Sequence, residues 1–118
     1  MIHGGIFTSH NQKLILSHVL KTSSIAERMR GLLWHTPLND GEGLLIQPCS
    51  SIHTFGMHYE IDVIFLSKDL TIKKIFSHVK PYRFVMSFGA AMVLEIVADS
   101  AAKLGLVENM KLQWELNK

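Results

Sequence analysis

The segment from Cys49 to Asp62 brings together several residue types that can do chemistry. It reads Cys-Ser-Ser-Ile-His-Thr-Phe-Gly-Met-His-Tyr-Glu-Ile-Asp and continues directly into an apolar run. A thiol, two imidazoles and two carboxylates form an unusual mixture for a stretch that only fills a core, because such polar groups are seldom buried without a role. We therefore expect a functional site on this segment.

Cys49 and His53 are the residue types of nucleophilic catalysis, in which an imidazole activates a thiolate. Four residues of an extended strand span about 13 Å, so this pair would need a loop, or a histidine from elsewhere, to form a dyad. The alternative is a structural cysteine, because Cys behaves as a small hydrophobe in protein cores. A small hydrolase or transferase that uses Cys49 or a His/Asp pair is thus one alternative function.

Metal binding is a second chemistry that these residue types allow. The ligand types in the segment are Cys49, His53, His58, Glu60 and Asp62. Their spacing matches none of the closed zinc patterns, which rest on paired short Cys or His spacings. A three-ligand open site on the loop remains an alternative to a solvated turn. We predict no metal and assign no cofactor.

Two carboxylates interrupt apolar strands and should have partners, because an unpaired buried carboxylate is costly. Asp62 begins one such strand, and its candidate partners by residue type are Arg28, Arg83, His53 and Thr54. Glu95 lies inside another and could face solvent or a shared polar pocket. Two neighbouring acidic groups can perform acid–base work, but loop anchoring is the more common role.

Two apolar or flexible stretches also have both a binding and a structural interpretation. Gly56 indicates a backbone conformation, or a close approach, that a side chain would forbid. That requirement suits a binding loop and equally a β-bulge. The segment Phe84–Met92 offers methionine and aromatic surface, which could form an adaptable binding wall or pack in the core.

The elements that must position these groups are mainly strands. Alternation and short apolar runs predict strands over residues 13–20, 43–47, 61–67, 71–78, 91–97 and 111–116. Leu14, Leu16, His18 and Leu20 would share one face of the first strand. The strand 61–67 is apolar on both faces, which favours a central position, and the Lys68-Asp69 turn would make 71–78 its hairpin partner.

Helices are fewer. Ser24 and Glu27 form a capping-box pattern ahead of an apolar stripe, which predicts one amphipathic helix. Asp99 or Ser100 could cap a second, short helix that ends at Gly105 in a left-handed conformation. Because the order is not alternating βαβ, we predict a mainly β (α+β) fold: a single compact β domain of about six strands with one amphipathic helix and one short helix.

Composition restricts the protein class. A chain of 118 residues is one domain by length, residues 1–118, with an ordinary 47% apolar and 19% charged fraction. The formal charge is +2 and the basic residues are spread out, so we predict no nucleic-acid partner. One cysteine excludes an internal disulfide and fits a reducing compartment. With no signal-peptide pattern and no apolar run near about 20 residues, we predict a soluble, cytoplasmic protein without membrane insertion.

Several separated motifs occur in an order that is typical of one family. They are Ala26–Leu33, Gly41–Cys49, Ser51–Met57 and Ile61–Leu66, followed by Pro81–Arg83, Ala91–Ile96 and Ala101–Leu106. Over about residues 26–112 the chain resembles the domain of unknown function 192 family, a widespread bacterial and archaeal group of uncharacterised proteins. The resemblance implies a compact β-rich domain, in the branch with the Cys…Ile-His-Thr-Phe-Gly-Met signature, and supplies no substrate, reaction or cofactor.

The resemblance also indicates which positions to test. The family signature falls on Arg28, Gly31, Cys49, His53, Thr54, Gly56, Met57, Asp62, Arg83 and Glu95. The chain departs from it at His58, Tyr59 and Glu60, where the branch has a basic residue, a ring and a proline. It departs again at Asn109–Met110, where a Gly-Asp turn is usual and Asn tolerates the left-handed turn.

We predict a non-enzymatic binding module for a small polar ligand or a protein partner, with its site on the Cys49–Asp62 loop. The predicted binding residues are Arg28, Cys49, His53, Thr54, Gly56, Met57, Asp62, Arg83 and Glu95. Besides the enzyme, the remaining alternative is a structural or assembly module that uses the Phe84–Met92 surface as its interface.

Overall fold

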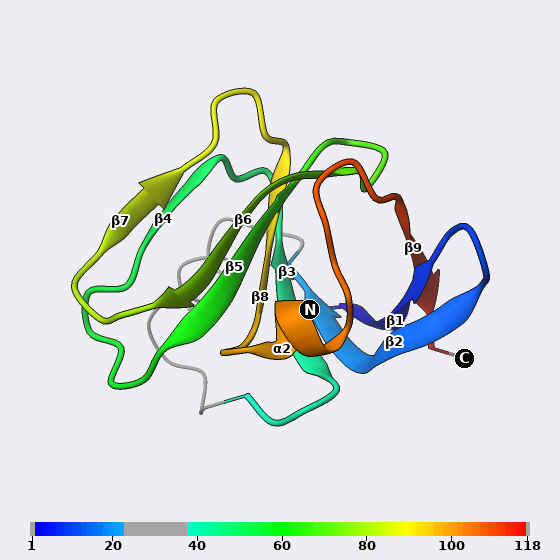
Figure 1. Ribbon diagram of the computed structural model, residues 1–118, viewed down its shortest axis with the longest axis horizontal. Coiled ribbons are helices and arrows are strands. Elements are labelled where there is room, and N and C mark those ends of the chain that lie inside the picture. The colour runs from blue at the N-terminus through cyan, green and yellow to red at the C-terminus, as the bar shows by residue number, and fades with distance from the viewer. Residues whose placement is uncertain (1, 23–37, 118) are drawn as a thin grey trace.

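The structure, a computed structural model, describes residues 2–22 and 38–117 (Figure 1). Within them lie nine strands and one short helix. These are β1 (Ile2–Thr8), β2 (Lys13–Lys21), β3 (Glu42–Ile46), β4 (Ser51–His53), β5 (Ile61–Leu66), β6 (Ile72–Val79), β7 (Phe84–Met86), β8 (Met92–Val97), α2 (Ser100–Lys103) and β9 (Leu112–Leu116). The fold is therefore mainly β, as predicted. The helix predicted to begin near Ser24, which includes Arg28, lies outside the described residues.

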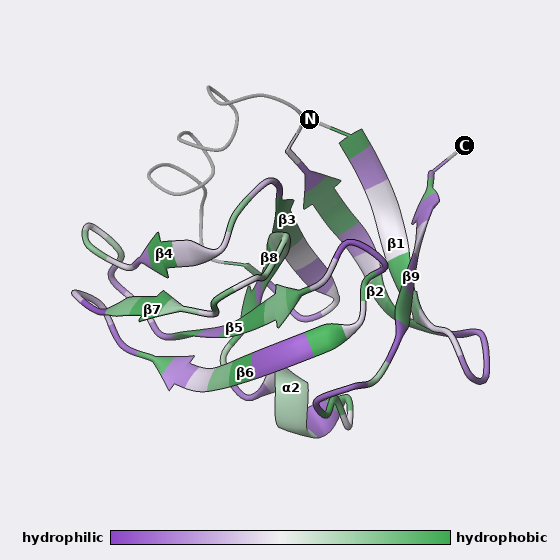
Figure 2. Ribbon diagram, turned by 90° about the horizontal axis from the view of Figure 1, so that it is seen from above, coloured by the Kyte–Doolittle hydropathy of each residue, from purple (hydrophilic) through white to green (hydrophobic). Residues whose placement is uncertain are grey.

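Seven of the strands form one strongly curled sheet in the order β6-β5-β8-β3-β2-β1-β9 (Figures 1 and 2). All neighbours are antiparallel except β2 and β3. The right-handed twist of β-sheets brings its two ends together. Thr71, just before β6, pairs with Lys111, just before β9, and the Ile72 N–H donates to the Met110 carbonyl at 2.8 Å. The sheet is consequently a nearly closed barrel.

The barrel interior holds the larger apolar cluster. All seven strands of the main sheet contribute side chains to it. Its buried members include Ile6, Leu16, Leu45, Ile64, Leu66, Ile72, Leu94, Ile96 and Leu112, with Ala101 and Leu106 from α2 and the loop after it. On β5, Ile64 and Leu66 face this interior, whereas Ile61, Val63 and Phe65 face the opposite side. The predicted two-faced, central strand is thus confirmed.

A two-stranded ribbon of β4 and β7 lies over the opposite side of β5 and β8 (Figure 2). Ile52 of β4 and Val85 of β7 pack there against Val63, Phe65 and Val93 in a second apolar cluster. Cys49 and Tyr59, both from the segment singled out in the sequence, pack against the same cluster. The ribbon therefore holds this segment against the outer face of the main sheet.

The strand count of about six was too low, because β1, β4 and β7 were not predicted. β1 carries two adjacent glycines, Gly4 and Gly5, which weaken a strand signal; a Cβ on Gly4 would lie 2.4 Å from the Glu115 carbonyl oxygen. β4 and β7 have only three residues each. Strands this short give period-two alternation too little length to be recognised.

The face predicted for residues 13–20 was also wrong. Leu14 is 47% exposed and His18 is exposed, whereas Ile15 and Leu16 are both buried. The cause is the pairing with β1, in which β2 has an extra residue between Val19 and Leu16 and again between Leu16 and Leu14. Each β-bulge shifts the alternation by one residue, so no single face runs along the strand.

The turn predictions were more accurate. β5 and β6 form the expected hairpin around Lys68-Asp69. The helix α2 starts after Asp99, and Gly105 closes it with φ +70°. Asn109 stands where the family usually has glycine. It adopts the left-handed conformation, with φ +72°, that the turn requires at this position. None of the described helices is long and apolar enough to cross a membrane.

Candidate functional site

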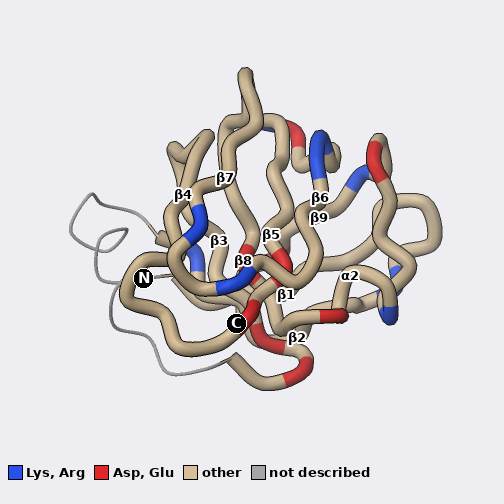
Figure 3. Tube along the Cα trace, turned by 60° about the vertical axis from the view of Figure 1, so that its left-hand side comes forward, with Lys and Arg blue, Asp and Glu red and all other residues tan. Residues whose placement is uncertain are grey.

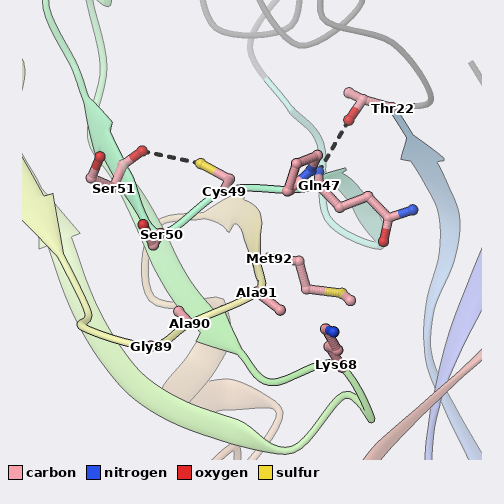
Figure 4. Close-up of a pocket in the computed structure, with 11 residues that line it drawn as sticks. Thr22, Gln47, Cys49, Ser50, Ser51, Lys68, Gly89, Ala90, Ala91 and Met92 are labelled. Carbon is pink, nitrogen blue, oxygen red and sulfur yellow. Dashed lines mark hydrogen bonds between the residues drawn. The ribbon is translucent and has the colours of Figure 1, made fainter.

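A pocket of about 920 Å³ lies beside Cys49 (Figure 4). Its described lining comes from four segments: Thr22 after β2, the turn from Gln47 to Ser51, Lys68 in the β5–β6 turn, and the loop from Gly89 to Met92. Ligand pockets commonly measure about 300–1,000 Å³, so this space suits a small molecule.

Main-chain hydrogen bonds hold the lining in place. The Gln47 N–H donates to the Thr22 hydroxyl at 3.2 Å, and the Cys49 N–H donates to the Ala91 carbonyl at 3.0 Å. The half-buried Cys49 thiol donates to the Ser51 carbonyl at 3.0 Å (Figure 4). In this arrangement the thiol acts as a hydrogen-bond donor to the main chain.

The electrostatic character of the pocket comes from lysine. Lys68 is the one formally charged side chain in the described lining, on the side opposite Cys49 in Figure 4. The Nζ of Lys73 lies close to Gly89, 3.4 Å from where a Cβ on that glycine would stand. Asp, Glu and His are absent from the described lining. Two ammonium groups without a neighbouring lining carboxylate make this opening favourable for an anion.

Asp62 is fully buried and serves as an anchor for three main-chain N–H groups. One carboxylate oxygen accepts from His78 at 2.9 Å and from Asp99 at 3.2 Å, and the other accepts from Ala101 at 2.9 Å. His78 and Asp99 have φ of +53° and +76°, so the carboxylate stabilises two left-handed residues. Among the described residues, main-chain N–H groups are thus the partners of Asp62, and the expectation of Arg83, His53 or Thr54 was wrong. The fourth candidate, Arg28, lies outside the described residues.

Thr54 performs a similar task between the loop and the segment before β7. Its hydroxyl donates to the Lys80 carbonyl at 2.6 Å and accepts from the Arg83 N–H at 2.9 Å.

Gly56 follows with φ +88°, and nothing lies within 4 Å of the place a Cβ would take. Its conformation, not a close approach, therefore requires glycine. Met57 then turns inward and is buried in the second apolar cluster.

His53 and Arg83 lie on the outer side of the ribbon. The His53 ring is 5.1 Å from that of Phe55, which is 6.1 Å from that of Tyr82. The Nδ1 atom of His53 is buried and makes no hydrogen bond with the part of the chain that the structure describes. Arg83 is exposed, and its Nη1 donates to the carbonyls of Pro81 and Tyr82, each at 3.5 Å.

Glu95 is fully buried in β8, opposite Val63 and Leu44. It faces the second apolar cluster, because Val93, two residues earlier, does so. Burial raises the pKa of the Tyr59 phenol, and the nearby Glu95 carboxylate raises that pKa further. Glu95 is therefore turned inward beneath the ribbon, near the partly buried Tyr59, and does not face solvent.

These contacts split the predicted site into separate places. Cys49 lines the pocket, Glu95 lies beneath the ribbon, Asp62 anchors the α2 end, and His53 and Arg83 face outward. Arg28 lies outside the described residues.

A family model described as Uncharacterized ACR, DUF192, matches residues 6–114.

The chain belongs to the DUF192 family.

Two solved structures resemble this DUF192 domain closely in fold. One is the crystal structure of a candidate transcription regulator from Sinorhizobium meliloti 1021, with TM-score 0.79 and 20% identity, covering 96% of this chain and 92% of that one. The other is a protein of unknown function from Novosphingobium aromaticivorans DSM 12444, with TM-score 0.74 and 26% identity, covering 95% and 84%. No curated protein matched the chain.

The DUF192 domain has a further charged cluster that the sequence reasoning missed. His78 Nδ1 lies 3.2 Å from Glu60, and its Nε2 lies 3.4 Å from Asp99. The hydrogen bond to Asp99 has the largest effect and raises the pKa of His78, whereas desolvation, the next largest effect, lowers it. The hydrogen bond to Glu60 and the charges of Asp62 and Asp99 raise the pKa further. Within residues 2–22 and 38–117 no three His, Cys, Asp or Glu side chains gather as metal ligands.

Pocket residues of the DUF192 domain were missed for a different reason. Thr22 and Lys68 are 27 and 19 residues from Cys49 in the sequence, and neither lies in a motif. The only available signal was the predicted hairpin, which places the turn at Lys68 at one end of the central strand. Their contribution depends on sheet order, which no local pattern reports.

Proposed function

We propose that this chain is a non-enzymatic binding domain that holds a small polar ligand with a carboxylate or phosphate group beside Cys49. One observation carries the proposal: hydroxyl, thiol, amide and ammonium groups from four segments converge on one pocket. A few convergent polar groups in a concave, preformed space are the usual signature of a ligand site.

The charge pattern supports an anionic ligand. Lys68 supplies an ammonium at the opening, and Lys73 supplies a second one near Gly89. The side chains of Ser50 and Ser51 offer hydroxyl groups that donate to carboxylate or phosphate oxygens, whereas Thr22 is fully buried and supports the lining through Gln47. A positively charged opening also attracts anions from solution before contact is made.

Binding is favoured over catalysis because the groups of a catalytic site are dispersed. An activated thiol needs a base within about 3 Å, and the described pocket lining contains neither an imidazole nor a carboxylate. The Cys49 thiol instead donates to the Ser51 carbonyl. The hydrolase or transferase alternative would require a base from outside this lining.

For the other residues predicted from the sequence, participation in binding stays a prediction. These residues are Arg28, His53, Thr54, Gly56, Met57, Asp62, Arg83 and Glu95. A cytoplasmic location likewise stays a prediction.

The first experiment compares native and denatured mass spectra of the purified protein. We expect a retained small acid or phosphate compound that is released on denaturation. If the protein emerges bare, thermal-shift titrations with inorganic phosphate and with citrate supply the anion. Binding should then raise the melting temperature with the logarithm of the anion concentration once that concentration exceeds the dissociation constant.

A matched pair of charge reversals assigns the site. Lys68→Glu should weaken anion binding about tenfold, because it replaces the attractive ammonium with a repulsive carboxylate. Lys13→Glu makes the same charge change on an exposed residue at the start of β2, outside the pocket lining, and should leave binding within about twofold. Equal losses in both variants would mean general charge attraction, and no binding of either anion would reject the proposal.

A further inference from the structure

The outer face of the β4–β7 ribbon carries a continuous set of large apolar side chains. In the ladder, His53 stands opposite Phe84 and Ser51 stands opposite Met86. Val85, between Phe84 and Met86, packs inward against the second apolar cluster. Because side chains alternate along a strand, Phe84 and Met86 point away from the protein.

Two further rings extend this set at one end of the ribbon. Phe55 packs beside His53, with ring centroids 5.1 Å apart, and Tyr82 packs beside Phe55 at 6.1 Å. We call His53, Phe55, Tyr82, Phe84 and Met86 the aromatic face. Its four large apolar members are between 51% and 67% exposed. Scattered apolar residues are normal on a surface, whereas a contiguous group marks an interaction site.

The charges that border the aromatic face are mainly positive. Residues 47–60 and 80–91, which make up the ribbon and its loops, contain Lys80, Arg83 and one acidic residue, Glu60, whose carboxylate lies 3.2 Å from His78 Nδ1. The chain has ten acidic residues, and elsewhere both basic and acidic positions occur along the tube in Figure 3. An apolar face bordered by uncompensated positive charge complements an acidic partner. A second copy of this chain would instead bring the same positive charges into contact.

The geometry of the ribbon fits an extended chain. Phe84 and Met86 occupy alternate positions on β7, so their attachment points are about 6.8 Å apart. An extended peptide presents its own alternate side chains at the same spacing. In the described sheets, β4 and β7 pair only with each other, which leaves main-chain groups for strand addition.

We propose that the aromatic face docks an extended, acidic segment of a partner protein, in which large apolar residues alternate with Asp or Glu. The apolar residues would pack between Phe84, Met86 and the Phe55–Tyr82 pair, while the carboxylates would meet Lys80 and Arg83. This surface is distinct from the pocket beside Cys49, because no residue of the aromatic face lines that pocket. The nearest approach along the ladder is Ser51, a lining residue that stands opposite Met86.

The test begins with displayed random dodecapeptides selected on the intact protein. We expect the enriched sequences to combine acidic residues with alternating large apolar residues. The best peptide is then synthesised with a fluorophore, and its dissociation constant is measured by anisotropy. Enrichment of sequences without acidic residues, or no enrichment at all, would overturn the proposal.

Matched variants locate the bound peptide. Phe84→Ser should weaken binding by about tenfold or more, since an aromatic side chain at the centre of an interface is a typical hot spot. Leu116→Ser removes an equally exposed side chain from β9, at 61% against 62%, and should leave binding unchanged. Lys80→Glu should weaken binding at low salt more than at high salt. A loss that is the same for Phe84→Ser and Leu116→Ser would overturn the proposal.

Two other occupants are distinguished in the same assay. Sedimentation of the wild type that shows a dimer abolished by Phe84→Ser would assign the face to a second copy. Oligothymidylate that binds through Phe84 while the selected peptide does not would assign it to single-stranded nucleic acid, whose bases stack on aromatic platforms. Either result overturns the acidic-peptide proposal, and neither affects the anion pocket.

Discussion

The barrel interior and the β4–β7 ribbon contain similar apolar residue types but use them differently. In the barrel, side chains such as Leu94, Ile64 and Leu66 are fully buried. On the ribbon, Phe84 and Met86 are 62% and 52% exposed. Both faces of the main sheet are buried at β5, one in the barrel interior and one under the ribbon, whereas the two-stranded ribbon has only one face on the core. Apolar residues on its other face add little to folding, which points to recognition.

The largest expected effect comes from the barrel. Leu94→Ala should lower the free energy of unfolding by about 3 kcal/mol, because it leaves a cavity between Leu45 and Ile64 in the closed interior. Phe84→Ala, the matched change on the ribbon, should alter it by no more than about 0.5 kcal/mol. Urea unfolding followed by circular dichroism measures both. Similar losses in the two variants would remove the distinction between a structural interior and a recognition face.

A smaller effect is expected at the anchor that joins β5 to α2. Asp62→Asn keeps the shape of the side chain but replaces one acceptor oxygen with an N–H donor, which faces main-chain N–H groups. We expect a loss of about 2 kcal/mol in the free energy of unfolding.

Asp40→Asn is the control for this substitution, because Asp40 lies in an exposed turn before β3. It should have no measurable effect in the same urea titration. If Asp62→Asn were equally silent, the three main-chain bonds would contribute nothing, and Asp62 would be free for a role in ligand binding.

The smallest effect should depend on pH. The pKa of His78 is raised in the folded protein, chiefly by its hydrogen bond to Asp99. The protonated ring is therefore stabilised by folding, and this contribution is complete below the unfolded-state pKa of about 6.5 and is lost as pH rises through the higher folded-state pKa. Stability attributable to His78 should consequently decline above about pH 6.5.

His78→Asn tests this dependence, since Asn tolerates the left-handed backbone at φ +53° and carries no titrating ring. The difference in urea midpoint between the wild type and this variant should shrink from about pH 5.5 to pH 8. A difference that stays constant over that range would show that the His78 charge makes no contribution.

The family, the mainly β class and most of the long strands could be predicted from the sequence. Each of those strands has five or more residues and a clear apolar run, and the turns at Lys68-Asp69, Gly105 and Asn109 carry local chemical signals. The short strands β4 and β7 were missed because the ribbon is stabilised by packing on β5 and β8, not by its own pattern. The face of β2 was wrong because its bulges arise from pairing with β1.

The sequence by itself determined that the Cys49–Asp62 segment is chemically rich and that Asp62 and Glu95 would need compensation when buried. Only the tertiary structure decided what compensates Asp62: main-chain N–H groups 16, 37 and 39 residues away. It also decided that Thr22 and Lys68 meet Cys49 around one pocket. The physical reason is that residue type sets the energetic cost of burial locally, whereas the partner that offsets it is chosen by strand order across the whole sheet.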